Sequence, residues 1–286
     1  MTYTSSNNPK IKLIRALRQR KERQSSGLFA IEGIRPVGEA VEAMQAGLAY
    51  VALEFLCYAP ELLTSEYALS LVEKEKSRGL PCYAVTAETF ASFADKENPQ
   101  GILAVARRNQ TSLEGLIPQN FPWGVGLISP QDPGNIGAIL RTVDAVGASG
   151  LLLLDRGADP THPGAVRASM GTLFWYPVVN ASFDEFVEWA RGYGYALVGT
   201  SAHGSQDFRT VQMYARPLVL LMGSEREGLT AGQAACCDRV VRLPMLGRAT
   251  SLNLAVATGI LLYDVAEKLG VLNESARAGY AAPGSL

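Results

Sequence analysis

The chain has 286 residues, of which 48% are hydrophobic and 19% are charged. This composition supports one large or two medium-sized folded domains and excludes a wholly disordered chain. The formal net charge of −1 argues against a protein that coats nucleic acid through a broadly basic surface. The sequence shows no secretory signal and no apolar run near the roughly 18 residues that cross a bilayer. We therefore expect a cytoplasmic protein without a membrane partner.

Positive charge is concentrated at the N-terminus. Residues 1–35 carry a formal charge of +6, which leaves −7 for the rest of the chain. Apolar residues at positions 11, 13, 14 and 17 give this stretch the spacing of an amphipathic helix. A basic helix of this kind is either a solvated face or a surface that contacts phosphates, and its charge alone does not separate the two.

The first part of the chain alternates between strand and helix patterns, which indicates a small α/β domain over residues 1–107. We expect strands at 28–33, 49–55, 82–86 and 101–108, and helices at 35–46, 61–78 and 88–94. Residues 109–122 are polar, contain two prolines and lack periodicity, so the linker is placed at 108–121.

Residues 122–270 alternate more clearly, and their continuously apolar strands are typical of a parallel sheet covered on both faces. We expect strands at 125–129, 150–155, 176–179, 195–201, 217–223 and 240–245, and helices at 135–146, 166–173, 183–191 and 251–269. Ser251 is the expected N-cap of the last helix. The small and polar residues 271–286 are expected to be a mobile tail.

Four cysteines and two histidines form no CxxC pair or ligand cluster, so we expect no metal site and reduced thiols. The first candidate for chemistry is the segment QDPGNIGAILRTVDAVG, residues 131–147, which joins a strand to a helix. Only Gly134 and Gly137 fall in its turn, so the fingerprint of a dinucleotide-binding dehydrogenase is incomplete. The chain also lacks a P-loop and a GxSxG nucleophile elbow. A helix N-terminus after a glycine turn suits an anion, and Arg141 lies farther along the same helix.

Two further segments follow buried strands near the C-terminus. The first is LMGSEREGL, residues 221–229, and the second is LPMLGRATSLNLAVATG, residues 243–259. Ligands of α/β proteins bind where strands end, so both segments are candidate parts of one site.

Together, in this order, the three segments resemble the SpoU family of SPOUT methyltransferases. The shared residues are Asp132-Pro133-x-Asn135-x-Gly137 with Arg141-Thr142, Gly223-x-Glu225-x-x-Gly228-Leu229, and Leu243-Pro244-Met245-x-Gly247 with Ser251-Leu252-Asn253. The N-terminal part is similar to the RNA substrate-binding domain of the rRNA-type members. The resemblance implies an L30e-like α/β domain followed by a SPOUT α/β domain with a deep trefoil knot.

The resemblance also implies a function: methyl transfer from S-adenosylmethionine to a ribose 2′-hydroxyl of structured RNA, with 23S rRNA as the expected substrate. Family membership implies a homodimer formed through the C-terminal domain. A tRNA methyltransferase and a non-catalytic RNA-binding protein remain alternatives. A nicotinamide-dependent dehydrogenase is disfavoured because residues 131–147 lack the full set of glycines of the dinucleotide-binding fingerprint.

The resemblance assigns the catalytic and cofactor-binding candidates residue by residue, and the basic N-terminal helix supplies the RNA-binding candidates. Arg141, Asn135, Glu225 and Asn253 are expected to be catalytic, with Glu225 and Asn253 holding the loops and Arg141 in place. The cofactor would be bound by Thr200, Gly223, Leu243, Ser251 and Leu252. RNA phosphates would be contacted by Lys10, Lys12, Arg15, Arg18, Arg20, Lys21 and Arg23. Arg226 and Glu227 stand where many members have smaller residues, at the rim of the expected site.

Overall fold

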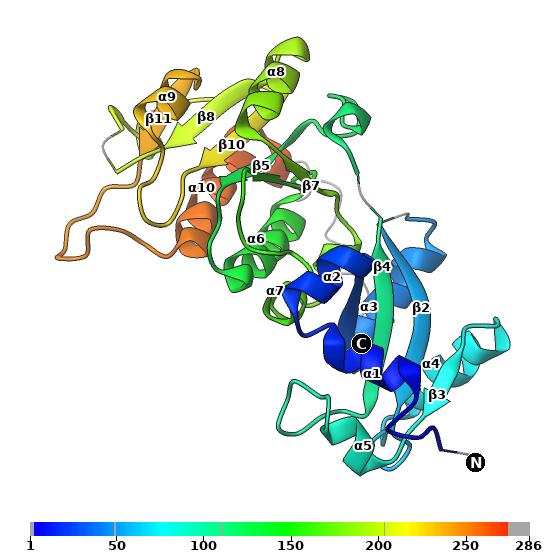
Figure 1. Ribbon diagram of the computed structural model, residues 1–286. Coiled ribbons are helices and arrows are strands. Elements are labelled where there is room, and N and C mark those ends of the chain that lie inside the picture. The colour runs from blue at the N-terminus through cyan, green and yellow to red at the C-terminus, as the bar shows by residue number, and fades with distance from the viewer. Residues whose placement is uncertain (1–2, 49, 110, 203, 274–286) are drawn as a thin grey trace. The chain divides into compact units, whose positions relative to one another are not determined.

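The computed structural model describes residues 3–48, 50–109, 111–202 and 204–273 (Figure 1). It contains two compact units, each formed by two stretches of chain. The first unit comprises Met1–Gln110 and Asp159–Trp175, and the second comprises Thr111–Ala158 and Tyr176–Leu286. The tail expected at 271–286 lies largely outside the described residues. In the part of the chain that is described, no helix is both long and apolar enough to cross a membrane.

The first unit is built on a mixed four-stranded sheet in the order β1-β4-β2-β3. Strand β4 pairs antiparallel with β1 and β2, whereas β2 and β3 are parallel. Its elements are α1 (Pro9–Ala16), α2 (Arg20–Ser26), β1 (Leu28–Glu32), α3 (Ile34–Gln45), β2 (Val51–Tyr58), α4 (Glu66–Ser77), β3 (Cys82–Ala84), α5 (Ala87–Ala91), β4 (Ile102–Arg108), α7 (Pro163–Ser169) and the 3₁₀ helix η2 (Thr172–Phe174).

The expected N-terminal helix is present and anchors the sequence before β1. Ile11, Ile14 and Leu17 are at most 2% exposed and pack into a core with Phe55 and Phe90. The apolar stripe therefore faces the unit's interior, which leaves the basic side chains between its residues near the surface. The stretch is broken into α1 and α2, and Gly27 ends α2 in a left-handed conformation.

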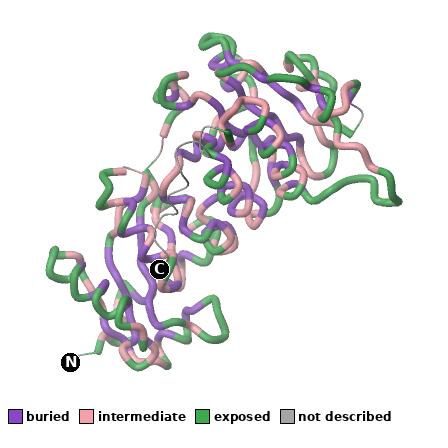
Figure 2. The backbone as a smooth tube through the Cα atoms, turned by 180° about the vertical axis from the view of Figure 1, so that it is seen from behind, coloured by how far each residue is buried: buried purple, intermediate pink, exposed green. Residues whose placement is uncertain are grey.

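The second unit is built on a seven-stranded sheet in the order β7-β6-β5-β10-β8-β11-β9, in which every pair is parallel. Figure 2 shows that buried segments run through the interior of each unit, while exposed segments form outer helix faces and connecting loops. The elements of the second unit are the 3₁₀ helix η1 (Leu113–Gly115), β5 (Trp123–Ile128), α6 (Pro133–Val146), β6 (Leu151–Leu154), β7 (Val178–Ala181), α8 (Phe183–Gly192), β8 (Ala196–Thr200), β9 (Gln206–Asp207), the 3₁₀ helix η3 (Phe208–Thr210), β10 (Leu218–Met222), α9 (Ala231–Ala235), β11 (Arg239–Arg242) and α10 (Leu254–Lys268).

The division of the chain differs from the sequence expectation in two places. The stretch Asp159–Trp175, which falls inside the expected domain 122–270, belongs to the first unit. Its Phe174 ring stacks on Phe29 at a centroid distance of 6.3 Å, and the indole Nε1 of Trp175 donates to Glu39 at 2.9 Å. The expected linker 108–121 is partly core, because Phe121 is fully buried in the second unit.

Two helices begin later than their patterns indicate. Helix α4 starts at Glu66 because the Ser65 side chain accepts a hydrogen bond from the amide of Ala68. Helix α10 starts at Leu254, and its N-cap is Asn253 rather than the expected Ser251. The sequence patterns did not predict β9 or α9, which are two and five residues long.

Candidate functional site

A cavity of about 350 Å³ lies where β8, β10 and β11 end and α10 begins. All five residues expected to bind the cofactor line it: Thr200, Gly223, Leu243, Ser251 and Leu252. The carboxyl ends of parallel strands meet at one edge of a sheet, which is why residues more than 50 positions apart converge here.

Gly223 closes one wall of this cavity. A Cβ at position 223 would lie 2.1 Å from the backbone carbon of Gly228, so no other residue fits without moving the backbone. Ser224 and Gly228 are joined by two backbone hydrogen bonds, of 3.2 and 2.9 Å, which tie the loop between them into a tight turn. This turn, residues 224–228, is called the glutamate loop below because it carries Glu225.

The rest of the lining combines apolar side chains with main-chain and hydroxyl groups. The apolar side chains include those of Val241, Met245, Leu254, Ala257 and Leu261. A cavity of this kind suits a flat apolar ring with polar edges, because side chains cover the ring while main-chain groups bind its edges.

Three of the four residues expected to be catalytic form one hydrogen-bonded set. The Nδ2 of Asn135 donates to Glu225 Oε1 at 3.2 Å, and the Nδ2 of Asn253 donates to Asn135 Oδ1 at 3.0 Å. Asn135 is only 6% exposed, so these bonds fix its amide group. We call Asn135, Glu225 and Asn253 the amide set.

The amide set also joins three separate segments of backbone. Glu225 accepts hydrogen bonds from the amides of Gln131 and Asp132, at 3.0 to 3.4 Å, and so holds the glutamate loop against the start of α6. Asn253 Oδ1 caps α10 by accepting from the amides of Ala255 and Val256. Each of these two side chains therefore binds backbone as well as Asn135.

Arg141, the fourth residue, stands apart from this set. It lies six residues after Asn135 on α6, so it points to a different face of the helix. Its side chain is exposed and makes no hydrogen bond or ion pair with any residue that the structure describes. Glu225 and Asn253 therefore bind backbone and Asn135, and none of their described hydrogen bonds reaches Arg141, contrary to the expectation that they hold it.

The expected RNA-contacting residues differ in exposure and in the contacts that they make. Lys10, Lys12, Arg18, Arg20 and Lys21 are exposed. Arg15 donates to Ser6 O and Ser92 Oγ, and Arg18 donates to Ala94 O. The ammonium group of Lys10 lies 5.1 Å from the centre of the Phe55 ring.

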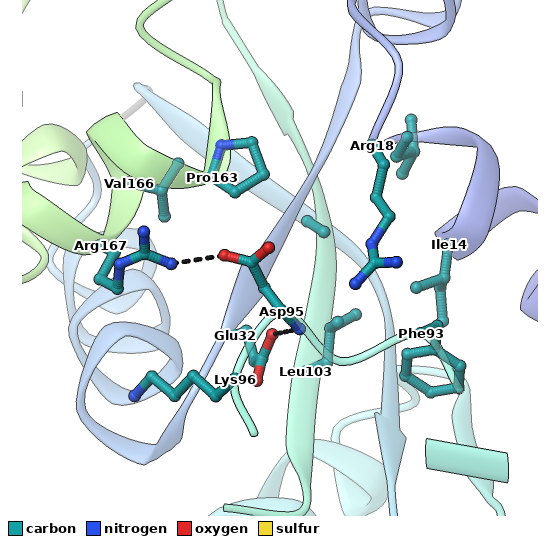
Figure 3. A pocket seen from close by; sticks show the side chains of 12 residues that line it. Ile14, Arg18, Glu32, Phe93, Asp95, Lys96, Leu103, Pro163, Val166 and Arg167 are labelled. Carbon is teal, nitrogen blue, oxygen red and sulfur yellow. Dashed lines mark hydrogen bonds and ion pairs between the residues drawn. The ribbon is translucent and has the colours of Figure 1, made fainter. Parts of the chain in front are cut away.

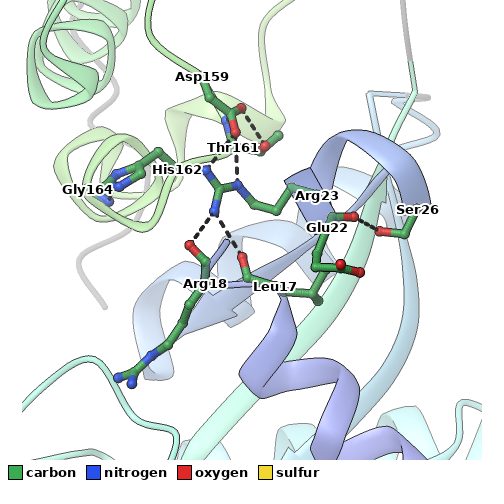
Figure 4. A network of polar contacts seen from close by, with 9 residues as sticks. All are labelled: Leu17, Arg18, Glu22, Arg23, Ser26, Asp159, Thr161, His162 and Gly164. Carbon is green, nitrogen blue, oxygen red and sulfur yellow. Dashed lines mark hydrogen bonds and ion pairs between the residues drawn. The ribbon is translucent and has the colours of Figure 1, made fainter. Parts of the chain in front are cut away.

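Arg23 is wrongly included in the RNA-contacting set. It is 4% exposed, its guanidinium pairs with Asp159 at 2.8 Å, and it donates to the carbonyl oxygens of Leu17 and Arg18 (Figure 4). Burial raises the pKa of Asp159, but hydrogen bonds from Thr161 and Arg23 outweigh this effect and leave that pKa below its ordinary value. Because the guanidinium of Arg23 is buried and its donors are engaged, it is not available to bind a phosphate.

Sequence reasoning missed two basic residues beside Arg18. Lys96 and Arg167 line the same small hollow of about 40 Å³, and Arg167 forms an ion pair with Asp95 (Figure 3). The three cations come from positions 18, 96 and 167, so a search for clustered charge along the sequence does not find them. Gln131 was also missed, because its role is played by its backbone amide.

A sequence model of the SpoU rRNA Methylase family matches residues 123–263, and a model of the MRM3-like substrate binding domain matches residues 8–104. The chain is 32% identical over 255 residues to the 23S rRNA (uridine(2479)-2'-O)-methyltransferase of Streptomyces viridochromogenes, covering 87% of this chain and 85% of that protein. It is 29% identical over 262 residues to the 23S rRNA (guanosine(2553)-2'-O)-methyltransferase RlmP of Bacillus subtilis (strain 168), covering 91% and 97%.

Two solved structures that resemble this chain are also methyltransferases. The AdoMet-bound rRNA methyltransferase from Sinorhizobium meliloti superimposes with a TM-score of 0.80 and 35% identity, covering 91% of this chain and 95% of that one. The SpoU methyltransferase AviRb from Streptomyces viridochromogenes gives a TM-score of 0.81 with 30% identity, over 93% and 99% of the two chains.

Proposed function

The chain belongs to the SpoU rRNA methylase family, and from this premise we propose that it transfers a methyl group from S-adenosylmethionine to a ribose 2′-hydroxyl of 23S rRNA. One observation carries the proposal. The five residues expected to bind the cofactor line a single cavity, and the glutamate loop that borders this cavity also holds Asn135. Cofactor and ribose would thus meet across one rigid loop.

The cavity fits S-adenosylmethionine in chemistry. The apolar side chains of Leu243, Leu254 and Leu261 would cover an adenine ring, and the main chain around Gly223 and Leu252 would supply hydrogen-bonding groups for its edges. Thr200 and Ser251 add hydroxyl groups at the rim. When bound, the cofactor would supply an electrophilic sulfonium methyl group for in-line attack by the ribose 2′-oxygen, with the S–CH3 electron pair leaving on the thioether S-adenosylhomocysteine and the hydroxyl proton passing to solvent.

The protein's contribution is chiefly to place the ribose, because alignment of the reacting atoms is a large part of catalysis in such a displacement. The Asn135 amide has two hydrogens and two lone pairs, and the amide set uses one of each. One donor and one acceptor remain to orient a ribose. Glu225 and Asn253 act as positioning residues, since their side chains fix Asn135.

Arg141 is proposed to bind the phosphate next to the target nucleotide or to stabilise the developing 2′-oxyanion. An arginine side chain stays protonated in proteins, so it serves as a charged donor and not as a base. Its exposure and lack of a partner among the described residues leave its donors available to RNA. A planar guanidinium can grip a phosphate with two parallel hydrogen bonds.

We further propose that the protein works as a homodimer through the second unit. Val256, Ile260 and Tyr263 are 52%, 41% and 50% exposed, and their spacing places them on one face of α10. The opposite face of this helix is buried, so an apolar stripe remains uncovered in the single chain. The trefoil knot that the family implies, and the role of the first unit in RNA binding, stay predictions of the same proposal.

The test is transfer of tritiated methyl from S-adenosylmethionine to unmodified transcripts of 23S rRNA, with 16S rRNA and tRNA transcripts in parallel. A 2′-O-methyl group blocks alkaline cleavage, so the label should survive in one alkali-resistant dinucleotide from 23S rRNA. Asn135→Ala should abolish the label, and the control Glu188→Gln, on an exposed side chain of α8, should leave it unchanged. Binding of the cofactor without transfer to any RNA would reject the proposal, and label in tRNA alone would reject 23S rRNA.

A further inference from the structure

A second hollow, of about 250 Å³, lies on the other side of the glutamate loop from the cofactor cavity. It sits where β5 and β10 end, and these two strands are parallel neighbours in the middle of the sheet. From β5 the chain continues outward through β6 and β7, whereas β8 and β11 lie beyond β10. Ligands of open parallel sheets bind at such a reversal of strand order. We call this space the switch-point hollow.

The walls of the switch-point hollow are held rigidly. The glutamate loop is closed by its own backbone hydrogen bonds and is tied to the start of α6 through Glu225. On the facing side, Ser129 adopts a left-handed conformation with φ of 46°, which is rare for a residue other than glycine. Its carbonyl oxygen accepts from Gln131 Nε2 at 2.7 Å. A preformed hollow of this kind loses little conformational entropy when it binds a ligand.

The hollow is polar, and its lining includes one positively charged and one negatively charged side chain. Arg226 and Glu227 are exposed, line both the hollow and the cofactor cavity, and form no side-chain ion pair with any residue that the structure describes. Ser129, Gln131, Thr230 and Gln233 add hydroxyl and amide groups. An unpaired guanidinium beside an unpaired carboxylate offers donors and acceptors together, with no net charge.

The presence of both an arginine and a glutamate in the lining favours a nucleobase over a phosphate as the occupant. The free carboxylate of Glu227 would repel a phosphate, whereas a base edge presents the carbonyl and N–H groups that an arginine and a glutamate recognise. Unstacked RNA bases are read through these edges and also stack on arginine planes. The base of the reacting nucleotide is joined directly to the ribose that Asn135 is proposed to orient.

We propose that the switch-point hollow binds the unstacked base of the nucleotide being methylated, and that Arg226 and Glu227 determine which base is accepted. This inference rests on the proposed function and names its substrate more closely. It explains why bulky charged residues stand in a loop whose backbone already serves the cofactor cavity.

The experiment uses the full chain and a 23S rRNA fragment around the mapped methylation site, transcribed in four versions with A, C, G or U at that position. The wild-type protein should prefer one base by about tenfold or more in kcat/KM, as expected for a good side-chain pairing to a base edge. Arg226→Ala and Glu227→Gln should each reduce that preference to within about threefold. Because both side chains also line the cofactor cavity, equilibrium dialysis measures the Kd for S-adenosylmethionine of each variant, and kcat/KM is compared at saturating cofactor.

Two control variants are matched to these changes. Arg216→Ala removes an exposed arginine at the opposite end of β10, and Glu188→Gln neutralises an exposed glutamate on α8. Both should keep the wild-type preference. If Arg226→Ala weakens all four substrates equally and Glu227→Gln strengthens all four, the hollow holds a phosphate and the inference is wrong. Unchanged preference in both test variants also overturns it, whereas a wild-type protein that labels no RNA rejects the proposed function itself.

Discussion

At the scale of single residues, the site depends on how one amide is held. Asn135 is buried and has a partner on each side, Glu225 and Asn253, and both partners also bind backbone. A side chain fixed in this way keeps its orientation without help from the ligand. Arg141 differs in having no partner among the described residues, so its position must be set by what binds to it.

This contrast predicts a specific loss when Arg141 is altered. Arg141→Lys keeps the positive charge but removes the two-pronged donor, so kcat/KM should fall about tenfold or more. Arg141→Ala should cost about a hundredfold or more, as for the loss of a group that stabilises an oxyanion. Methyl-transfer kinetics measure both values, and Arg216→Ala is the control. An Arg141→Lys protein with full activity would contradict the bidentate role.

The buried pair of Arg23 and Asp159 predicts a large stability effect. Arg23→Met should lower the free energy of unfolding by about 3–5 kcal/mol, because it leaves the Asp159 carboxylate buried without its partner. Arg107→Met, which breaks a half-exposed pair with Glu54, should cost about 0–1 kcal/mol. Urea titration of the full chain measures both, and equal effects would contradict this prediction.

The same pair predicts a pH dependence. The pKa of Asp159 is lower in the folded protein than in the unfolded chain, so its contribution to stability is complete above the ordinary carboxyl pKa. That contribution should disappear as the pH falls through the folded-state value. Asp159→Asn should therefore reduce the acid sensitivity of unfolding relative to the wild-type protein, and unchanged acid sensitivity would argue against it.

At the scale of elements, α10 has two faces with different roles. Leu261, Leu262 and Val265 are fully buried or nearly so, whereas Val256 and Ile260 remain exposed. Ile260→Asp places a charge in the proposed subunit interface and should convert a dimer into monomers. Light scattering after size-exclusion chromatography measures the mass. Lys74→Asp, on an exposed side of α4, is the control, and a dimer that survives Ile260→Asp would contradict the assignment.

The sequence predicted the elements of the parallel sheet well, because buried strands such as Leu151–Leu154 and Leu218–Met222 are continuously apolar. It also identified the members of the amide set. It did not predict which of them touch, since Asn135 and Asn253 are 118 positions apart and meet only through the fold. Nor could it predict the burial of Arg23. The residues around Arg23 are the same whether or not Asp159, 136 positions away, folds back to pair with it.

At the scale of the whole molecule, the near-neutral charge conceals an uneven distribution. The excess of +6 lies in residues 1–35, and much of it falls on α1 and α2. Helix α1 is anchored by apolar side chains buried in the first unit, and α2 is anchored by the buried Arg23. The basic side chains are therefore displayed by a fixed scaffold and not by a flexible arm. A surface of this kind binds RNA with an affinity that falls as salt rises.

This arrangement predicts that Lys12→Ala/Lys21→Ala weakens RNA binding and flattens its dependence on salt. The slope of log K against log salt should decrease by about 0.7–0.9 for each phosphate that the protein no longer neutralises. Filter binding of 23S rRNA transcripts at several salt concentrations gives the slope, with Lys74→Ala/Lys76→Ala as the matched control. Identical slopes in the two double variants would contradict it. Deleting residues 1–24 is a poorer test, because it also removes buried Ile11 and Leu17.

The stretch Asp159–Trp175 has a consequence for how the protein can be divided. Each unit is discontinuous in sequence, so a gene fragment that begins at residue 111 encodes a stretch whose packing partners it lacks. In such a fragment Val166, Leu173 and Phe174, each at most 4% exposed in the intact chain, would lose the surroundings that bury them. A separable methyltransferase half therefore requires residues 159–175 to be replaced by a short connector. Shuffling of the two units between relatives succeeds only when the first unit and this stretch are exchanged together.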